Sequence, residues 1–141
     1  MPCNLTLWGA NFNVDAFIKK CGFTADSIGR RGEPVYKSKP DGRKFDGSSC
    51  TIEVSGAEFN AFNQQVSDVI SYLKNNREAL KHIPKAEGLE YAVLDFGVSF
   101  NPPNGFYQSQ RLSAELVKLA AEINIGITIS MYAPSEEELN Q

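Results

Sequence analysis

Several segments of this chain alternate between apolar and polar residues, and only one of their two faces is apolar. In the first such segment Leu5 and Leu7 point one way, while Thr6 and Trp8 point the other. Two later segments carry apolar sets with the same spacing, Cys50, Ile52 and Val54, then Ile125, Ile127, Ile129 and Met131. A repeat of two with one apolar face is typical of strands in a sheet that is covered on one side only. Residues 89–100 are apolar on both parities, which indicates a central strand.

Helical periodicity separates these strands. Residues 14–21 bury one face, and the segment follows Asn13, a favourable N-cap, and precedes Gly22, which suits a left-handed C-terminal position. A later helix is predicted to begin at Ser113 and to stop near Asn124. Both helices are therefore specified by residues close to their own ends.

A longer helix is predicted between these two. Ser55 and Glu58 have the spacing of a capping box, in which each side chain bonds the backbone of the other residue. The apolar stripe that follows consists of Phe59, Phe62, Val66, Val69, Ile70 and Leu73. A short helical turn comes next and is ended by Pro84.

Strands with one apolar face require all the helices to lie on the same side of the sheet. The predicted fold is therefore α+β, a two-layer sandwich whose mixed, mainly antiparallel sheet has three helices on one face, and a ferredoxin-like variant is one arrangement that fits. A length of 141 residues suits a single domain over 1–141, with 134–141 as a frayed tail. No segment approaches the roughly 20 apolar residues that span a bilayer, and three cysteines without a CxxC pair suit a reducing compartment, so a cytoplasmic protein without a membrane partner is expected.

A dense basic segment interrupts this pattern. Residues 29–44 hold six of the chain's fourteen Lys and Arg residues, although the formal net charge is −3. They lie within a long basic loop predicted over 23–48, in which a strand at 34–37 is only weakly indicated. Connections longer than about 12 to 15 residues are usually functional or disordered. The segment is therefore interpreted either as a solvated loop or as a contact surface for an anionic partner.

Two stretches of the sequence carry a family resemblance. They are GFTADSIGRRGEPVYK and, near the end, RLSAELVKLAAEINIGITISMY. The chain resembles a bacterial family known only as domain of unknown function 4279. The resemblance runs over nearly the whole chain and implies the fold and a bacterial origin. It assigns no active site.

Catalytic and cofactor chemistry finds little support in the sequence. The single histidine, His82, and the widely spaced Cys3, Cys21 and Cys50 do not have the spacing of a metal site, and no phosphate-binding loop is present. Neither catalytic residues, nor a metal, nor a cofactor is expected. Asp95 lies in the most apolar strand, where it is either a catalytic acid or a residue that sits on the open sheet face or bonds a backbone group, and the second is preferred. A pI near 5.2 argues against a nucleic-acid partner.

Two groups of residues are the candidates for binding. In the basic loop, Arg30 and Arg31 are predicted to engage carboxylates or phosphates, with Arg43 and Lys44 adding charge and Tyr36 serving as an anchor. The open sheet face carries aromatic and polar residues that a partner would cover, unless the loop itself folds across them. They are Trp8, Thr51, Glu53, Thr128 and Tyr132.

These features favour a non-catalytic binding protein that recognises an acidic or anionic partner protein. An immunity-type inhibitor that blocks a toxin is one form of such a protein. Two alternatives remain open, a sensor or enzyme for a small anionic ligand held by the arginine pair, and a homodimer formed through the open face.

Overall fold

Five strands form one mixed sheet in the computed structural model, which describes residues 2–102 and 104–139. The strands are β1 (Cys3–Gly9), β2 (Ser27–Gly29), β3 (Ser48–Ser55), β4 (Tyr91–Ser99) and β5 (Gly126–Tyr132). Their order in the sheet is β2-β3-β1-β4-β5. β1 pairs antiparallel with β3 and β4, β2 pairs antiparallel with β3, and β4 and β5 are parallel. The predicted mixed, mainly antiparallel sheet is confirmed.

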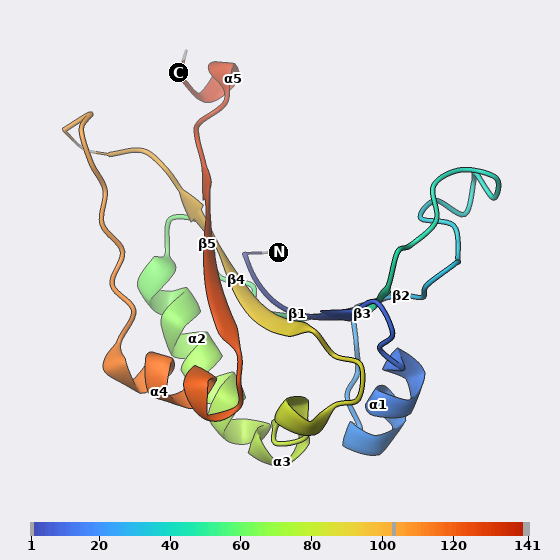
Figure 1. The fold of residues 1–141 in the computed structure, drawn as a ribbon. Coiled ribbons are helices and arrows are strands. Elements are labelled where there is room, and N and C mark those ends of the chain that lie inside the picture. The colour runs from blue at the N-terminus through green and yellow to red at the C-terminus, as the bar shows by residue number, and fades with distance from the viewer. Residues whose placement is uncertain (1, 103, 140–141) are drawn as a thin grey trace.

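The helices cover one face of this sheet, as Figure 1 shows for α1 to α4. Their bounds are α1 (Val14–Cys21), α2 (Phe62–Asn75), α3 (Arg77–Leu80), the 3-10 helix η1 (Ile83–Lys85), α4 (Ala114–Glu122) and α5 (Glu136–Leu139). The predicted α+β two-layer sandwich is therefore confirmed. The number of α-helices in the described residues is five rather than the predicted three, because the turn before Pro84 and the C-terminal segment each form a short helix.

The connections explain how the two layers arise. The unit β1-α1-β2 is split by β3, which inserts between its strands, and the unit β3-α2-β4 is split by β1. This is the split βαβ topology of the ferredoxin-like fold. A further helix, α4, then crosses the helical layer and returns the chain as β5, parallel to β4.

The core lies between the sheet and the helices. Leu5 and Leu7 of β1 and Leu94 of β4 are fully buried against Val69 of α2 and Leu116 of α4. Residues of the opposite parity in these strands, on the face without helices, are half-buried or exposed, except Gly97, which Phe59 covers. The alternation in the sequence thus corresponds to one covered and one uncovered face.

Local end signals behave as predicted in α1 and α4. The side chain of Asn13 accepts a hydrogen bond from the Ala16 amide at 3.2 Å, and Gly22 adopts a left-handed conformation with φ 74°. The hydroxyl of Ser113 accepts from the Leu116 amide at 3.2 Å, and Asn124 follows α4 with φ 59°.

The predicted capping box before α2 is wrong. Ser55 is the last residue of β3, where it pairs with Cys3 next to a register irregularity. Its hydroxyl accepts from the Ala57 amide and donates to the Asp68 carboxylate at 2.7 Å. Sheet pairing therefore takes precedence over the local signal, and α2 begins only at Phe62.

One weaker prediction also changes. Within the predicted loop over 23–48 the strand is β2, and the region predicted at 34–37 contributes only the isolated bridge between Pro34 and Lys44. The predicted tail at 134–141 includes α5, and its residues 140–141 lie outside the described residues.

Candidate binding surface

The basic segment between β2 and β3 is an ordered hairpin, here called the basic hairpin and defined as residues 30–45. The Gly32 amide donates to the Phe45 carbonyl at 3.0 Å, and the Val35 amide donates to the Arg43 carbonyl at 2.9 Å. The bond from the Lys39 amide to the Tyr36 carbonyl closes a turn at the tip. In Figure 1 this segment stands away from the sheet on the side without helices. It does not fold across the open face.

The two predicted arginines lie at the base of the basic hairpin and bind groups of this chain. Arg30 donates from Nε and Nη2 to the two carboxylate oxygens of Asp15 in α1, each at 2.9 Å. This pairing lowers the pKa of the Asp15 carboxyl below its ordinary value and raises that of Arg30. Arg31 donates from Nη1 to the side-chain oxygen of Asn11 at 2.8 Å. Both side chains therefore fasten the hairpin to the body of the protein.

The tip of the basic hairpin, residues 36–43, carries exposed cationic side chains. The Tyr36 side chain is 63% exposed, and Lys37, Lys39 and Arg43 surround it in the sequence and are also exposed. Among the described residues no carboxylate forms a salt bridge with these three cations. Lys44 differs, because its ammonium group donates to the Pro40 carbonyl. The tip thus presents an aromatic ring among free positive charges.

An aromatic stack lies on the open sheet face near the base of the basic hairpin. The rings of Trp8 and Tyr91 are 5.6 Å apart and nearly parallel, and the Tyr91 side chain is 48% exposed. Trp8 is opposite Ser49 in β3, directly after the hairpin returns to the sheet, and its ring packs on Gly47. We call Trp8, Tyr91 and the hairpin tip together the hairpin surface.

Tyr132, the other predicted aromatic anchor, lies at the opposite end of the sheet. Tyr132 is opposite Ser99 in β4, whereas Trp8 is opposite Tyr91. These two positions on β4 are eight residues apart, which corresponds to roughly 27 Å along a strand. Trp8 and Tyr132 therefore share a face but do not form one contact patch.

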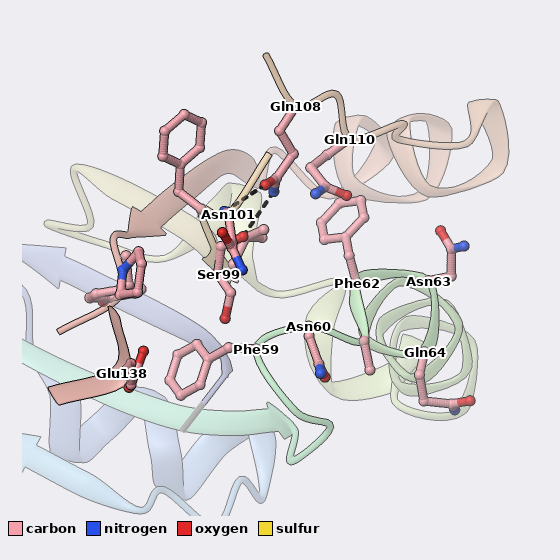
Figure 2. Close-up of a pocket in the computed structure, with 15 residues that line it drawn as sticks. Phe59, Asn60, Phe62, Asn63, Gln64, Ser99, Asn101, Gln108, Gln110 and Glu138 are labelled. Carbon is pink, nitrogen blue, oxygen red and sulfur yellow. Dashed lines mark hydrogen bonds between the residues drawn. The ribbon is translucent and has the colours of Figure 1, made fainter. Parts of the chain in front are cut away.

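The end of the sheet that holds Tyr132 contains a feature that the sequence analysis missed. A cavity of about 710 Å³ opens where β4 and β5 end and α2 begins. Figure 2 shows amide side chains around it that come from two distant stretches of the chain. We call it the amide pocket after Asn60, Asn63, Gln64, Asn101, Gln108 and Gln110. The signal in the sequence is a concentration of Asn and Gln at 60–64 and 101–110, but nothing local shows that the two stretches meet.

Comparison with known proteins places the chain in a family. The family model described as Domain of unknown function (DUF4279) matches residues 1–134 of the 141. The chain belongs to the DUF4279 family. No curated protein and no solved structure matches it.

In this DUF4279 protein the cysteines belong to the packed interior. Cys3 and Cys50 are fully buried, and burial raises the pKa of their thiols to about 12 and about 11. Both thiols are therefore protonated at neutral pH, and a protonated thiol is a poor nucleophile.

The remaining candidates for chemistry in the DUF4279 chain are dispersed. Within the described residues no group of three or more His, Cys, Asp or Glu side chains is arranged to hold a metal ion. Asp95 lies on the open face, where it accepts a hydrogen bond from the Ser130 hydroxyl at 2.7 Å. None of the helices in the described ranges has the length and apolarity needed to cross a bilayer.

Proposed function

We propose that this DUF4279 protein is a non-catalytic binding protein that recognises an acidic surface of a partner protein through the hairpin surface. The observation that carries the proposal is the basic hairpin, which exposes Tyr36 and unpaired cations at its tip and has the Trp8–Tyr91 stack near its base. Unpaired charges speed the encounter with an acidic partner, while exposed aromatic rings supply buried area with few rotatable bonds.

The biological setting follows from the same features. All three cysteines are free, which suits a reducing compartment, and we place the protein in the bacterial cytoplasm. An immunity-type inhibitor that blocks a toxin fits a small binding protein of this kind. A projecting hairpin that reaches into a partner's cleft suits such inhibition.

A small anionic ligand gripped by the arginine pair is less well supported. A shallow cavity of about 360 Å³ does lie beside Arg30 and Arg31. However, Asp15 also lines this cavity and already occupies Arg30 in a bidentate pair. An entering anion would have to displace that carboxylate, whereas an acidic protein reaches the hairpin tip without breaking any bond.

The test compares two double charge reversals. Lys37→Glu/Lys39→Glu changes the hairpin tip, and Lys85→Glu/Lys118→Glu makes the same charge change at exposed lysines on the helical layer. Tagged proteins are used to capture partners from extracts of the source organism, and the captured partner is then purified and its affinity measured directly. We expect the tip variant to weaken binding by roughly ten- to a hundred-fold and the control to change it little, with affinity falling as salt rises.

Three results would contradict the proposal. The first is equal affinity for the two double variants. The second is a wild-type protein that captures no partner and is a dimer by light scattering, which would favour the homodimeric alternative. The third is thermal stabilisation by phosphate or citrate that Arg31→Ala abolishes, which would favour a small anionic ligand.

A further inference from the structure

The amide pocket lies where open sheets often bind ligands. β4 and β5 are parallel, and their carboxyl ends form one wall together with Ser99, Asn101 and Tyr132. Asn60, just before α2, and the first turn of α2 with Asn63 and Gln64 form the facing wall (Figure 2). A crevice beyond the carboxyl ends of parallel strands is a preferred site for ligands. The volume of about 710 Å³ lies within the range of pockets that hold small molecules.

One of the six amides holds the wall of the pocket in place. The side-chain oxygen of Gln108 accepts a hydrogen bond from the backbone N–H of Asn101 at 3.0 Å. The side-chain nitrogen of Gln108 donates to the Ser99 carbonyl at 2.9 Å. Gln108 thus pairs with the end of β4 as another strand would. The backbone amide of Phe100 donates to the Tyr132 carbonyl at 2.8 Å, which fixes the neighbouring side. The pocket is therefore preformed.

Most of the other amides are available to a ligand. Gln64 donates one hydrogen bond, from its nitrogen to Asp68 at 2.8 Å. The side chains that form no hydrogen bond to another described residue are Asn60, Asn63, Asn101 and Gln110. Each amide offers two N–H donors and an acceptor oxygen. The pocket wall therefore presents donors and acceptors side by side, which is the pattern needed to bind hydroxyl groups.

The charge around the pocket excludes an anion as the favoured ligand. The described lining residues include no Lys, Arg or His, and their single charged side chain is Glu138 of α5. Phosphates and carboxylates are normally bound by cationic side chains, and the carboxylate of Glu138 repels them. The N-terminus of α2 is favourable to negative charge, but its dipole contribution is modest and is opposed by Glu138.

Aromatic rings complete the lining. The Phe59 side chain is 39% exposed and meets the Tyr132 ring edge-to-face, with centroids 5.5 Å apart. Phe59 packs on Gly97, where any Cβ atom would lie 2.7 Å from its ring. The electron-rich face of an exposed aromatic ring attracts C–H groups that carry partial positive charge. Amides for hydroxyl groups and rings for C–H groups are together the chemistry that recognises a sugar.

We propose that the amide pocket binds an uncharged saccharide of one or two rings. The amides of Asn63 and Gln110 bind its hydroxyl groups, and Phe59 and Tyr132 contact its C–H surface. This site is separate from the hairpin surface and does not depend on the function proposed for it.

The experiment is an NMR titration of the full chain with glucose, galactose, N-acetylglucosamine, maltose and cellobiose. A site open on one side is expected to have a dissociation constant near ~1 mM, so each sugar is taken to about ten times that concentration. At least one sugar should produce saturable shifts at the backbone amide of Asn63 and the side-chain amide of Gln110. Asn63→Ala and Gln110→Ala should each weaken binding by roughly five- to ten-fold, since each removes a hydrogen bond to the ligand.

The controls separate this site from its alternatives. Asn75→Ala removes an exposed amide at the other end of α2 and should leave affinity unchanged. Lys37→Glu/Lys39→Glu should also leave it unchanged, so the saccharide site and the hairpin surface can fail independently. The proposal is overturned if none of the five sugars produces saturable shifts, if shifts persist in both pocket variants, or if only phosphate or a blocked alanine peptide binds.

Discussion

At the scale of single residues, Gln65 is a polar side chain that is fully buried in the core. It is 0% exposed, and its amide nitrogen donates to the Glu58 carbonyl at 3.1 Å and to the Gly97 carbonyl at 2.8 Å. Gln65 thus ties α2 both to the loop before it and to β4. Its own side-chain oxygen has no hydrogen-bond partner among the described residues. The two hydrogen bonds that Gln65 donates supply the carbonyls of Glu58 and Gly97 with a partner. A buried carbonyl without a donor would destabilise the folded state.

The first prediction concerns this residue. Gln65→Met keeps the side-chain volume but leaves the carbonyls of Glu58 and Gly97 without this donor, so we expect the free energy of unfolding to fall by about 2 kcal/mol. Urea denaturation of purified protein measures this change. Gln64→Met alters an exposed neighbour on the same helix and should cost less than about 0.5 kcal/mol. Equal costs for the two variants would show that the Gln65 bonds contribute nothing.

At the scale of elements, the basic hairpin depends on how its base is held. The few backbone hydrogen bonds between its two arms do not by themselves fix the direction in which it projects from the sheet. The bidentate pair between Arg30 and Asp15 joins the hairpin to α1, and Arg31 joins it to the turn before α1 through Asn11. Both partners of the ion pair are solvent-exposed, so the pair adds little to the stability of the fold. Its role is to orient the basic hairpin relative to α1.

The second prediction is that the hairpin anchor weakens in acid. The hydrogen bond from Arg30 holds the pKa of Asp15 below its ordinary value of 3.8. Because the folded-state pKa is the lower one, the pair contributes fully above pH 3.8, and its contribution is lost as the pH falls through the folded-state pKa. Asp15→Asn should remove the anchor at neutral pH and lower the hydrogen-exchange protection of the Gly32 and Val35 amides by roughly two- to five-fold.

The matched control is Asp41→Asn at the tip of the basic hairpin. This substitution removes an exposed carboxylate that forms no salt bridge with a described residue, so protection at the hairpin base should stay the same. A carbon-detected titration of the Asp15 carboxyl checks the direction of the pKa shift. An Asp15 that titrates above 3.8 would contradict the assigned pair.

Elements also differ in how far the sequence predicts them. The ends of α1 and α4 follow from residues within three positions of each end, such as Asn13 and Ser113, and both were predicted correctly. The start of α2 was not, because sheet pairing holds Ser55 in β3. The amide pocket was not predicted either, because its lining residues are far apart in the sequence. It joins α2 to the segment before α4, and only the folded sheet brings these parts of the chain together.

At the scale of the whole molecule, the protein has two distinct ends joined by a continuous sheet. The hairpin surface lies where β4 begins, at Tyr91, and the amide pocket lies where β4 ends, beside Ser99. Between them the open face is formed by small and polar side chains, including Thr6 and Thr51, whose hydroxyl oxygens are 3.4 Å apart. The split βαβ core thus carries the hairpin surface and the amide pocket, which we propose as binding sites, at opposite ends of one sheet.

The third prediction is that the two ends contribute independently to stability. Trp8→Ala removes the stack at the hairpin end and should lower the free energy of unfolding by about 2 kcal/mol, since the ring is half-buried. Gln65→Met acts beside Gly97, six residues from Tyr91 along β4, or roughly 20 Å away. At that separation the double variant should lose the sum of the two single costs to within about 0.5 kcal/mol. Urea denaturation of the four proteins in this cycle measures the coupling, and a coupling above about 1 kcal/mol would mean that the sheet transmits changes between the two ends.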